Sequence, residues 1–406
     1  MKILFITIGF LKHGGIAGYT AQLADYLLAR GEEVHVLTKH CEYRPSNLII
    51  HKSFLKNFLG LIPDLVVSPR SSLRIFSWSK EILDTYDNTR FVKQKESEFD
   101  IIHSNSTYSW KCDIVAMHNC QKTWIKIVNE ASKNKLPYLK YSLYKAGRWL
   151  PNKIILAIEK EVLEKGSKKI IAVSEGIKRE ILENYNVPEE KIVVIPPGVD
   201  LNEFEPNAKM KSKIRKELGV NQNACILMFP GGLDLERKGL EYLIRALPLA
   251  KDKIKLLITG TGNFQPYKQL ANSLNVLDKI IFTGFVPEIK NYYAASDIFV
   301  FPSFYEAFPG VILEAAASGL PILVTKVNGA EEVVVDSING FFIKRNPEDI
   351  ANKINLLIRD SNLRKQMGES VYKTAQKYSW EETARKTLEV YEEVLNIKRH
   401  YGRTVS

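Results

Sequence analysis

The sequence has few of the features that mark secreted, disulfide-bonded or membrane-spanning proteins. Its four cysteines form no CxxC pair and have no metal-ligand spacing to histidine. No apolar run is long enough to span a bilayer, and the run FLGLIPDLVV is interrupted by Pro63 and Asp64. The opening residues, MKILFITIGF, lack a signal-peptide cleavage site and lead into a glycine-rich loop. We therefore expect a cytoplasmic protein with reduced thiols that does not cross a membrane.

Acidic residues are scarce in one segment of the chain. The whole protein carries a net charge of +11, and residues 122–153 contribute +7 of it, because eight lysines or arginines face the single acid Glu130. Aromatic side chains are interleaved with these charges, a combination that suits an anionic membrane surface. Single-stranded nucleic acid and a simple solvated face remain alternatives. The candidate membrane-surface residues are Lys122, Trp124, Lys126, Lys133, Lys135, Lys140, Lys145 and Trp149.

Strand patterns alternate with helical patterns along most of the chain. The opening reads as a βαβ unit, and four further buried strands follow before Pro196. The turn-rich segment PPGVDLNEFEP interrupts this pattern, which restarts with ACILMFP, IKLLITG, KIIFTG, DIFVFPS and PILVT. We therefore predict an α/β protein with two Rossmann-like, doubly wound domains that face a central cleft.

The domain boundaries follow from the same pattern. A chain of 406 residues is too long for one ordinary core. We expect an N-terminal Rossmann-like domain over residues 1–199 and a C-terminal Rossmann-like domain over residues 200–379. The last residues, 380–406, are amphipathic and have no strand left to serve, so we expect them to pack back on the N-terminal domain.

The loop after the first strand, GFLKHGGIAGYT, is rich in glycine but does not read GxGxxG, and it lacks the acidic partner of a dinucleotide site. This disfavours a dehydrogenase. Gly14 and Gly15 would still let backbone amides at a helix start approach a pyrophosphate or a sugar. Adjacent glycines also occur in simple turns.

Two histidines follow buried strands of the first half. His103 comes directly after DII and His118 directly after DIVAM, so either side chain can lie at the carboxyl edge of the first sheet. Histidine is the usual proton-transfer group near neutral pH, but a lone histidine is more often a structural residue. The local pattern leaves both readings open.

A pair of carboxylates frames a predicted helix start in the stretch FYEAFPGVILEA. Pro309 and Gly310 suit the first turn of a helix, with Glu306 in the loop before it and Glu314 about one turn inside. Unpaired amides near Gly310 and Val311 suit a hydroxylated or phosphorylated ligand between the carboxylates. The alternative is that Glu306 only caps the helix and Glu314 is solvated.

Arg237 and Lys238 precede Gly239 at a predicted strand-to-helix loop. Paired cations in such a loop can neutralise a diphosphate leaving group without a metal ion, although this dipeptide is also an ordinary surface pair. Loops containing Gly260 and Val286 follow further strands, where exposed backbone can bracket a nucleotide base and its ribose.

Taken in this order, the stretches resemble family 4 of the retaining glycosyltransferases, enzymes of the GT-B fold that move a sugar from a nucleotide donor to an acceptor. The resemblance covers nearly the whole chain. It rests on GGIAGYTAQLADYLLARGEEVHVLT, SKKIIAVSEGIKREIL, NVPEEKIVVIPPGVDLNEFEP, RKGLEYLIRAL, TGFVPEIKNYYAASDIFVFPSFYEAFPGVILEAAASGLPIL and NGAEEVVVDSINGFF.

The resemblance implies roles for these residues. Glu306 and Glu314 match an E-x7-E motif whose first carboxylate lies at the donor sugar and whose second holds the ribose hydroxyls. His118 matches the catalytic-site histidine better than His103 does, so the predicted catalytic residues are His118 and Glu306. The predicted donor-binding residues are Gly14, Gly15, Arg237, Lys238, Gly260, Val286, Phe308, Pro309, Gly310, Val311 and Glu314, with no metal ligand. Two departures concern the donor: Gly232 stands where many relatives have arginine, and Pro309 where relatives often have glycine.

The resemblance implies a retaining glycosyltransferase with a UDP-sugar donor and no cofactor. Its N-terminal domain, residues 1–199, would bind the acceptor, and its C-terminal domain, residues 200–379, would bind the nucleotide sugar. We expect it to act at the inner face of the cell membrane on a lipid-linked or polysaccharide acceptor, with an anionic membrane surface as a further partner. A nucleotide-sugar epimerase of the same fold is the first alternative. A nucleic-acid-binding protein on this scaffold is the second. We do not expect a nucleic-acid partner, because +7 of the +11 net charge lies in residues 122–153 and does not spread along both domains.

Overall fold

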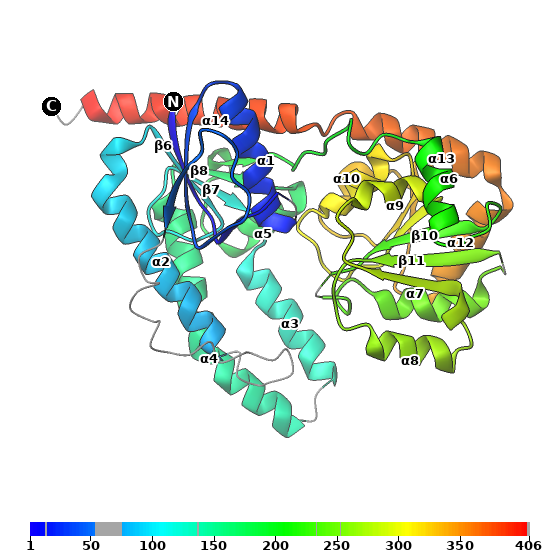
Figure 1. Cartoon of the computed structure of the whole chain (residues 1–406). Helices are drawn as coiled ribbons and strands as arrows, with labels where there is room; N and C mark the ends of the chain where they lie inside the picture. The colour runs from blue at the N-terminus through cyan, green and yellow to red at the C-terminus, as the bar shows by residue number, and fades with distance from the viewer. Residues whose placement is uncertain (13, 53–74, 136–137, 233, 252, 404–406) are drawn as a thin grey trace. The chain divides into compact units, whose positions relative to one another are not determined.

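The computed structural model describes residues 1–12, 14–52, 75–135, 138–232, 234–251 and 253–403, and the side chains of residues 75–82, 131–146 and 401–403 lie outside this description. The chain divides into two compact units. Met1–Ile195 and Thr383–Ser406 form the first unit, and Pro196–Glu382 forms the second. Each unit contains one large sheet with helices around it (Figure 1).

The first unit is built on a seven-stranded parallel sheet. In spatial order its strands are β5 (Ile49–Lys52), β3 (Glu33–Thr38), β1 (Lys2–Ile6), β6 (Ile101–Asn105), β7 (Ile114–Met117), β8 (Lys169–Ala172) and β9 (Ile192–Val194). A small parallel pair forms between β2 (Gly9–Phe10), which follows β1 in the chain, and β4 (His40–Cys41), which follows β3. Because strands buried on both faces must be apolar throughout, β1 reads KILFI.

Among the residues that the structure describes, six helices accompany this sheet. They are α1 (Gly15–Ala29), α2 (Ile75–Lys95), α3 (Gln121–Lys135), α4 (Tyr138–Glu161), α5 (Glu175–Asn184) and α14 (Trp380–Arg403), the last of which begins in the second unit. Short turns of 3-10 or π helix are η2 (Glu96–Glu98), η3 (Val162–Gly166) and η4 (Glu189–Lys191). Helices α3 and α4 pack against each other and extend away from the sheet (Figure 1).

Helix α14 is bound to the first unit by both polar and aromatic contacts. Its Tyr391 is fully buried, and its hydroxyl lies 2.7 Å from Nδ1 of His103 on β6. Lys398 forms an ion pair of 3.0 Å with Asp113, and Lys169 forms one of 2.7 Å with Glu393. The segment from Thr383 onward therefore belongs to the first unit.

The second unit contains a six-stranded parallel sheet. Its strands in spatial order are β12 (Ile280–Gly284), β11 (Ile254–Thr259), β10 (Cys225–Pro230), β13 (Ile298–Phe301), β14 (Ile322–Val324) and β15 (Gly340–Phe342). Its helices are α6 (Ala208–Glu217), α7 (Leu240–Ala246), α8 (Gln265–Ser273), α9 (Ile289–Ala295), α10 (Gly310–Ala317), α11 (Ala330–Val333), α12 (Pro347–Arg359) and α13 (Ser361–Ala375), with 3-10 turns η5 (Leu247–Leu249) and η6 (Leu277–Lys279). The buried faces of these elements form one continuous apolar core.

Both sheets reverse their strand order at an internal point. In the first unit the chain proceeds from β1 to β3 and β5, and then returns to the other side of β1 with β6. In the second it proceeds from β10 to β11 and β12, and returns with β13. Doubly wound sheets bind ligands outside the carboxyl ends of their strands at such a switch point. The β1–β6 and β10–β13 switch points are therefore the places to search for sites.

No helix among the described residues is long and apolar enough to cross a membrane.

Candidate active site

The loop after β10 carries Lys238 to the β10–β13 switch point of the second unit. Its ammonium donates hydrogen bonds to the main-chain oxygens of Gly231, at 2.7 Å, and Pro230, at 3.2 Å. An ammonium has three N–H groups, so one remains for a ligand. A Cβ on residue 232 would lie 3.2 Å from Lys238 Nζ. Glycine at 232, the first departure noted in the sequence, thus leaves space beside the ammonium.

The conformation of this loop depends on Gly239. Its φ of +79° lies in the left-handed region, and a Cβ there would lie 2.1 Å from the main-chain oxygen of Pro302, after β13. Only glycine allows this close approach between the two loops. The backbone amide of Phe304 then donates to the oxygen of Arg237 at 2.7 Å. The loops after β10 and β13 are therefore joined at their bases.

Arg237 and Glu306 are brought together by these two loops. The guanidinium of Arg237 donates to Oε1 of Glu306 and also to Oδ2 of Asp234, the latter at 3.1 Å. The Ser303 hydroxyl donates to the same Glu306 oxygen at 2.8 Å. Both side chains of the ion pair are largely buried, with 21% and 15% of their areas exposed. The first carboxylate of the motif is thus held in one orientation by a cation and a hydroxyl.

Glu314, the second carboxylate, lies on α10. Its Oε2 atom is shielded from solvent and has no hydrogen-bond partner among the described residues. Burial raises the pKa of Glu314, while the Tyr293 hydroxyl and Lys238 act in the opposite direction. Burial also lowers the pKa of Lys238, an effect that Glu306 opposes. A shielded carboxylate oxygen without a donor is a position where a ligand hydroxyl would satisfy the site.

The start of α10 leaves backbone groups accessible between these side chains. The helix begins at Gly310 after Pro309, as predicted, and no side chain caps it. Gly310 is exposed, and a Cβ there would meet nothing within 4 Å. Phe308 precedes the helix and packs against Gly329, where a Cβ would lie 2.6 Å from the Phe308 ring. Val311 is half-buried.

The loops after β11 and β12 hold the remaining predicted donor residues. Gly260 has a φ of +96°, and its amide donates to the oxygen of Gly284 at 2.7 Å. Val286 is buried, whereas its neighbour Phe285 is 73% exposed. An exposed aromatic ring at a strand end is available for stacking. These loops lie beside the β10–β13 switch point, on the β11 side.

His118 follows β7 at the carboxyl edge of the first sheet. Its ring is half-buried and meets the Tyr19 ring edge-on, with 4.7 Å between centroids. Nε2 is shielded from solvent and has no hydrogen-bond partner among the described residues. Burial lowers the pKa of His118 to about 4, so the imidazole is neutral at physiological pH. A neutral imidazole can exchange a hydrogen bond with a substrate hydroxyl.

His103 lies deeper, on β6, and differs from His118 in its surroundings. It is fully buried, packs against Phe5 and bonds the Tyr391 hydroxyl of α14. Burial, with a smaller contribution from His118, lowers the pKa of His103 to about 3. This environment is that of a core residue. The structure thereby separates two histidines that the sequence pattern could not.

Gly14 and Gly15 lie before and at the start of α1. Both are exposed, with φ of +99° and +44°, and a Cβ on either would meet nothing within 4 Å. No side chain caps this helix, and its first turn has no acidic residue. Its first amides are therefore accessible, a favourable position for an anionic ligand group.

The basic segment forms α3 and most of α4. Lys126 is exposed and Trp124 half-buried, whereas Lys122 donates to the Asn184 oxygen at 3.2 Å. Trp149 is 58% exposed, and Leu150 beside it is 57% exposed. The ammonium of Lys153 lies 4.2 Å from the Trp149 ring. The side chains of Lys133, Lys135, Lys140 and Lys145 lie outside the described residues.

Several residues that shape the site were not found from the sequence. Asp234 orients Arg237, Ser303 orients Glu306, and the Tyr293 hydroxyl opposes the rise in the pKa of Glu314.

In the first unit, the buried carboxylate of Glu159 accepts a hydrogen bond of 2.9 Å from the Gln121 amide at the start of α3. Burial raises the pKa of Glu159 to about 7. No local pattern distinguishes these residues from ordinary polar ones.

Profiles of two families match the chain. Residues 13–203 match the family described as Glycosyltransferase Family 4, and residues 210–374 match Glycosyl transferases group 1. Among curated relatives, an uncharacterized glycosyltransferase of Methanocaldococcus jannaschii is 29% identical over 96% of this chain and 98% of its own length. A D-inositol 3-phosphate glycosyltransferase of Kineococcus radiotolerans is 26% identical over 93% and 90%.

Solved structures show the same fold. WaaG, a glycosyltransferase involved in lipopolysaccharide biosynthesis, superposes with a TM-score of 0.74 at 20% identity, covering 96% of this chain and 99% of its own. HepE of Anabaena, in complex with UDP and glucose, superposes with a TM-score of 0.71 at 19% identity, covering 97% and 100%. The predicted GT-B fold and family are confirmed. The chain belongs to glycosyltransferase family 4, the retaining GT-B enzymes that transfer a sugar from a nucleotide sugar.

Proposed function

We propose that this chain transfers a sugar from a UDP-sugar to a hydroxyl group of a lipid-linked or cell-envelope glycan at the inner face of the cell membrane. The arrangement around the β10–β13 switch point carries this proposal, because Lys238, the Arg237–Glu306 pair and the unpartnered Glu314 oxygen share one strand edge. The structure of HepE with UDP and glucose supports the choice of UDP.

The donor chemistry assigned to this edge is electrostatic. As the glycosidic bond to the diphosphate breaks, negative charge grows on the departing phosphate oxygens. The remaining N–H of Lys238 and the guanidinium of Arg237 would stabilise that charge, and preorganised donors of this kind lower the barrier because they need no reorientation. Arg237 is shared with Glu306 and Asp234, so its charge is partly compensated before the donor binds. Lys238 is therefore the principal cation.

The two glutamates would hold the hydroxyl groups of the donor. Glu314 Oε2 has no partner and would accept from the ribose, while Glu306, oriented by Ser303, would face the transferred sugar. Backbone amides at Gly310 and Val311 supply donors between them. Gly260 and Val286 would flank the base, and Phe308 and Pro309 would shape the sugar subsite.

The first unit would supply groups for the phosphates and the acceptor. Gly14 and Gly15 leave the amides of α1 open to an anionic group. His118 would contact a substrate hydroxyl through Nε2 as a neutral hydrogen-bonding partner. Because the folded-state pKa of His118 is near 4, we assign the imidazole no positive charge in the reaction.

The basic segment supports a membrane location for the acceptor. Trp149 and Leu150 expose neighbouring apolar surface on α4, and Lys126 is exposed on α3. Exposed aromatic and aliphatic side chains next to lysines suit the interface of an anionic bilayer. WaaG, whose fold this chain shares, is involved in lipopolysaccharide biosynthesis.

A soluble polyol phosphate is the second candidate acceptor, because a relative covering most of the chain is a D-inositol 3-phosphate glycosyltransferase. Nucleotide-sugar epimerisation is the third candidate activity. Incubation with UDP-sugars and each acceptor class, followed by mass analysis and by chromatography that resolves epimers, separates the three. A glycosylated lipid supports the proposal, a glycosylated polyol phosphate supports the second candidate, and an epimerised nucleotide sugar supports the third.

The donor assignment can be tested before the acceptor is known. A thermal-shift screen of nucleoside diphosphates and nucleotide sugars should give the largest rise in melting temperature with UDP and its sugars, because only a ligand that binds the folded state stabilises it by mass action.

Turnover should persist in excess chelator, since Lys238 and Arg237 supply the cationic groups that would otherwise come from a metal ion. Restoration of lost turnover by Mg²⁺ or Mn²⁺ would contradict that reading.

A further inference from the structure

A buried carboxylate joins three helices of the first unit close to His118. Glu159 lies near the end of α4 and is fully buried. Its two oxygens accept hydrogen bonds of 2.9 and 3.1 Å from the Gln121 amide at the start of α3. One of these oxygens also accepts from the hydroxyl of Tyr185, directly after α5. A single side chain thus connects the start of α3 with the ends of α4 and α5.

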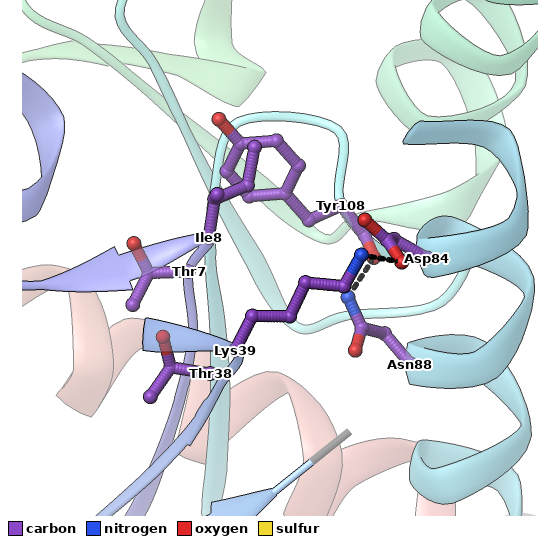
Figure 2. A pocket seen from close by; sticks show the side chains of 7 residues that line it. All are labelled: Thr7, Ile8, Thr38, Lys39, Asp84, Asn88 and Tyr108. Carbon is purple, nitrogen blue, oxygen red and sulfur yellow. Dashed lines mark hydrogen bonds and ion pairs between the residues drawn. The ribbon is translucent and has the colours of Figure 1, made fainter. Parts of the chain in front are cut away.

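The partners of Glu159 differ from those of Asp84, another buried carboxylate of the same unit. Asp84, on α2, forms an ion pair with Lys39, which directly follows β3 (Figure 2). The bonding partners of Glu159 among the described residues are instead a backbone amide and a phenol. Burying a carboxylate away from a cation is costly unless hydrogen-bond donors compensate it. Glu159 therefore meets a need for an acceptor that an apolar side chain could not meet.

The need for an acceptor lies at the start of α3. The first amides of a helix have no partners within the helix, and the first turn of α3 contains no acidic residue. Burial raises the pKa of Glu159, but the amides of Gln121 and Lys122 oppose that rise. Glu159 therefore caps α3 from a different helix, and the cap fixes where α3 begins.

A short loop connects this cap to His118. Strand β7 ends at Met117, and residues 118–120 lead directly into α3. The last of them, Cys120, is fully buried, and its main-chain oxygen accepts from the Trp124 amide at 2.9 Å. Because the reach of a chain is fixed by its number of residues, so short a loop cannot absorb a shift of either end. A displacement of the start of α3 would therefore move His118.

The His118 ring depends on the backbone for its position. It meets the Tyr19 ring edge-on, and its shielded Nε2 atom has no hydrogen-bond partner among the described residues. We infer that Glu159 is a positioning residue: its carboxylate fixes the start of α3 and thereby holds the His118 imidazole at the carboxyl end of β7. This inference rests on the proposed function, because it concerns the histidine assigned there to a substrate hydroxyl.

The test follows the His118 ring in the full chain. Histidines labelled with ¹³C at Cε1 each give one NMR signal, and the signal lost in His118→Asn is that of His118. Because the Tyr19 ring lies 4.7 Å away, the Hε1 chemical shift reports small displacements of the imidazole. The variants are Glu159→Gln, which keeps the size of the side chain but removes one acceptor oxygen, and Tyr185→Phe, which deletes one hydroxyl.

Two control variants lie on the same helix as Glu159. Glu161→Gln removes an exposed carboxylate that is paired with Lys165. Ile155→Val removes one methylene from a buried side chain about one turn before Glu159, and so lowers stability through the core. Neither control changes an acceptor of the α3 cap.

We expect the His118 signal to move most in Glu159→Gln, less in Tyr185→Phe, and in neither control. The signals of His35 and His51, on β3 and β5, should stay unchanged in all variants. In transfer assays Glu159→Gln should lower kcat about ten-fold or more with the donor KM unchanged, because a misplaced reacting group is costly.

A stationary His118 signal in Glu159→Gln, or an equal displacement in Ile155→Val, overturns the positioning role. If Glu159→Gln does not fold, a stationary signal in Tyr185→Phe overturns it. The NMR measurement needs no turnover, so it separates this inference from the proposed function. A displaced His118 signal with wild-type kcat supports the positioning of the ring and counts instead against the role proposed for His118.

Discussion

The two switch points occupy equivalent places in the two sheets but carry different chemistry. At the β10–β13 point, Arg237, Lys238 and Glu306 are charged and braced by the backbone. At the β1–β6 point, the charges of Lys39 and Asp84 cancel in an ion pair. The comparison shows that equivalent edges of one architecture can hold a lysine differently: Lys238 bonds main-chain oxygens at one edge, whereas Lys39 is paired with a carboxylate at the other.

The histidines extend the contrast between the units. Burial keeps both His103 and His118 uncharged near neutral pH. In the second unit, by contrast, burial acts on Glu314 and Lys238, whose opposite charges partly counter its effect on each other. In the first unit burial thus keeps these two histidines uncharged, whereas in the second the charges of Glu314 and Lys238 partly offset the effect of burial.

Removing the ammonium of Lys238 from the β10–β13 edge should have the largest effect on activity. We expect Lys238→Met to lower kcat by about 10²- to 10³-fold, the usual effect of deleting one preorganised donor to developing negative charge. Lys213→Met, which removes an exposed lysine of the same unit, should keep wild-type rates. Steady-state kinetics with saturating UDP-sugar measures both. Wild-type kcat in Lys238→Met would show that the charged edge is not the leaving-group site.

Glu314→Gln should have the next largest effect, and that effect should be weaker binding of the donor. Because a hydrogen bond to a charged acceptor contributes about 1.5–3 kcal/mol, we expect the donor KM to rise roughly ten- to hundred-fold with kcat little changed. Glu369→Gln, at an exposed position on α13, is the control. An unchanged donor KM in Glu314→Gln would mean that Oε2 meets no ligand hydroxyl.

The basic segment sharpens the comparison because only the first unit should meet the membrane. We expect the wild type to sediment with vesicles containing anionic lipid and to dissociate as salt rises, since each lysine near such a surface contributes about 1 kcal/mol. Replacing Trp149 with serine and Lys126 with glutamine should weaken binding several-fold and leave UDP affinity intact. Lys165→Gln is the exposed control. Equal binding to neutral vesicles would argue against an electrostatic surface.

The smallest expected effect is on acid stability. The folded-state pKa of His118 is about 4, below the ordinary 6.5, so the unfolded chain takes up more protons between these values. The stability from neutral His118 is present above pH 6.5 and is lost as the pH falls toward 4. His118→Asn should therefore flatten the fall in melting temperature over this range. A variant with the wild-type slope would show that the imidazole is not held neutral.

The sequence was sufficient for much of the fold because the strands are apolar and the loops after them contain glycine. The start of α10 at Gly310 was predicted from proline and glycine alone. Strands β5 and β15 were missed because they have four and three residues, too few for an alternating pattern to stand out.

The contacts of the candidate site were harder to predict than its members. Arg237 and Glu306 both stood out in the sequence, but their ion pair joins residues 69 positions apart and has no local signature. The ion pair of Lys39 with Asp84 and the hydrogen bond from the start of α3 to Glu159 likewise have no local signature in the sequence. Such pairs depend on how the sheet brings loops together, and the side-chain period of a segment does not contain that information.

The central claim is that the charged edge of the second unit holds the donor diphosphate, and hydrogen–deuterium exchange with and without UDP tests it most directly. Bound phosphates should protect backbone amides in peptides covering residues 231–240 and 303–315, and leave residues 33–41 of the first unit unchanged. UDP binding that protects neither second-unit segment would contradict the account.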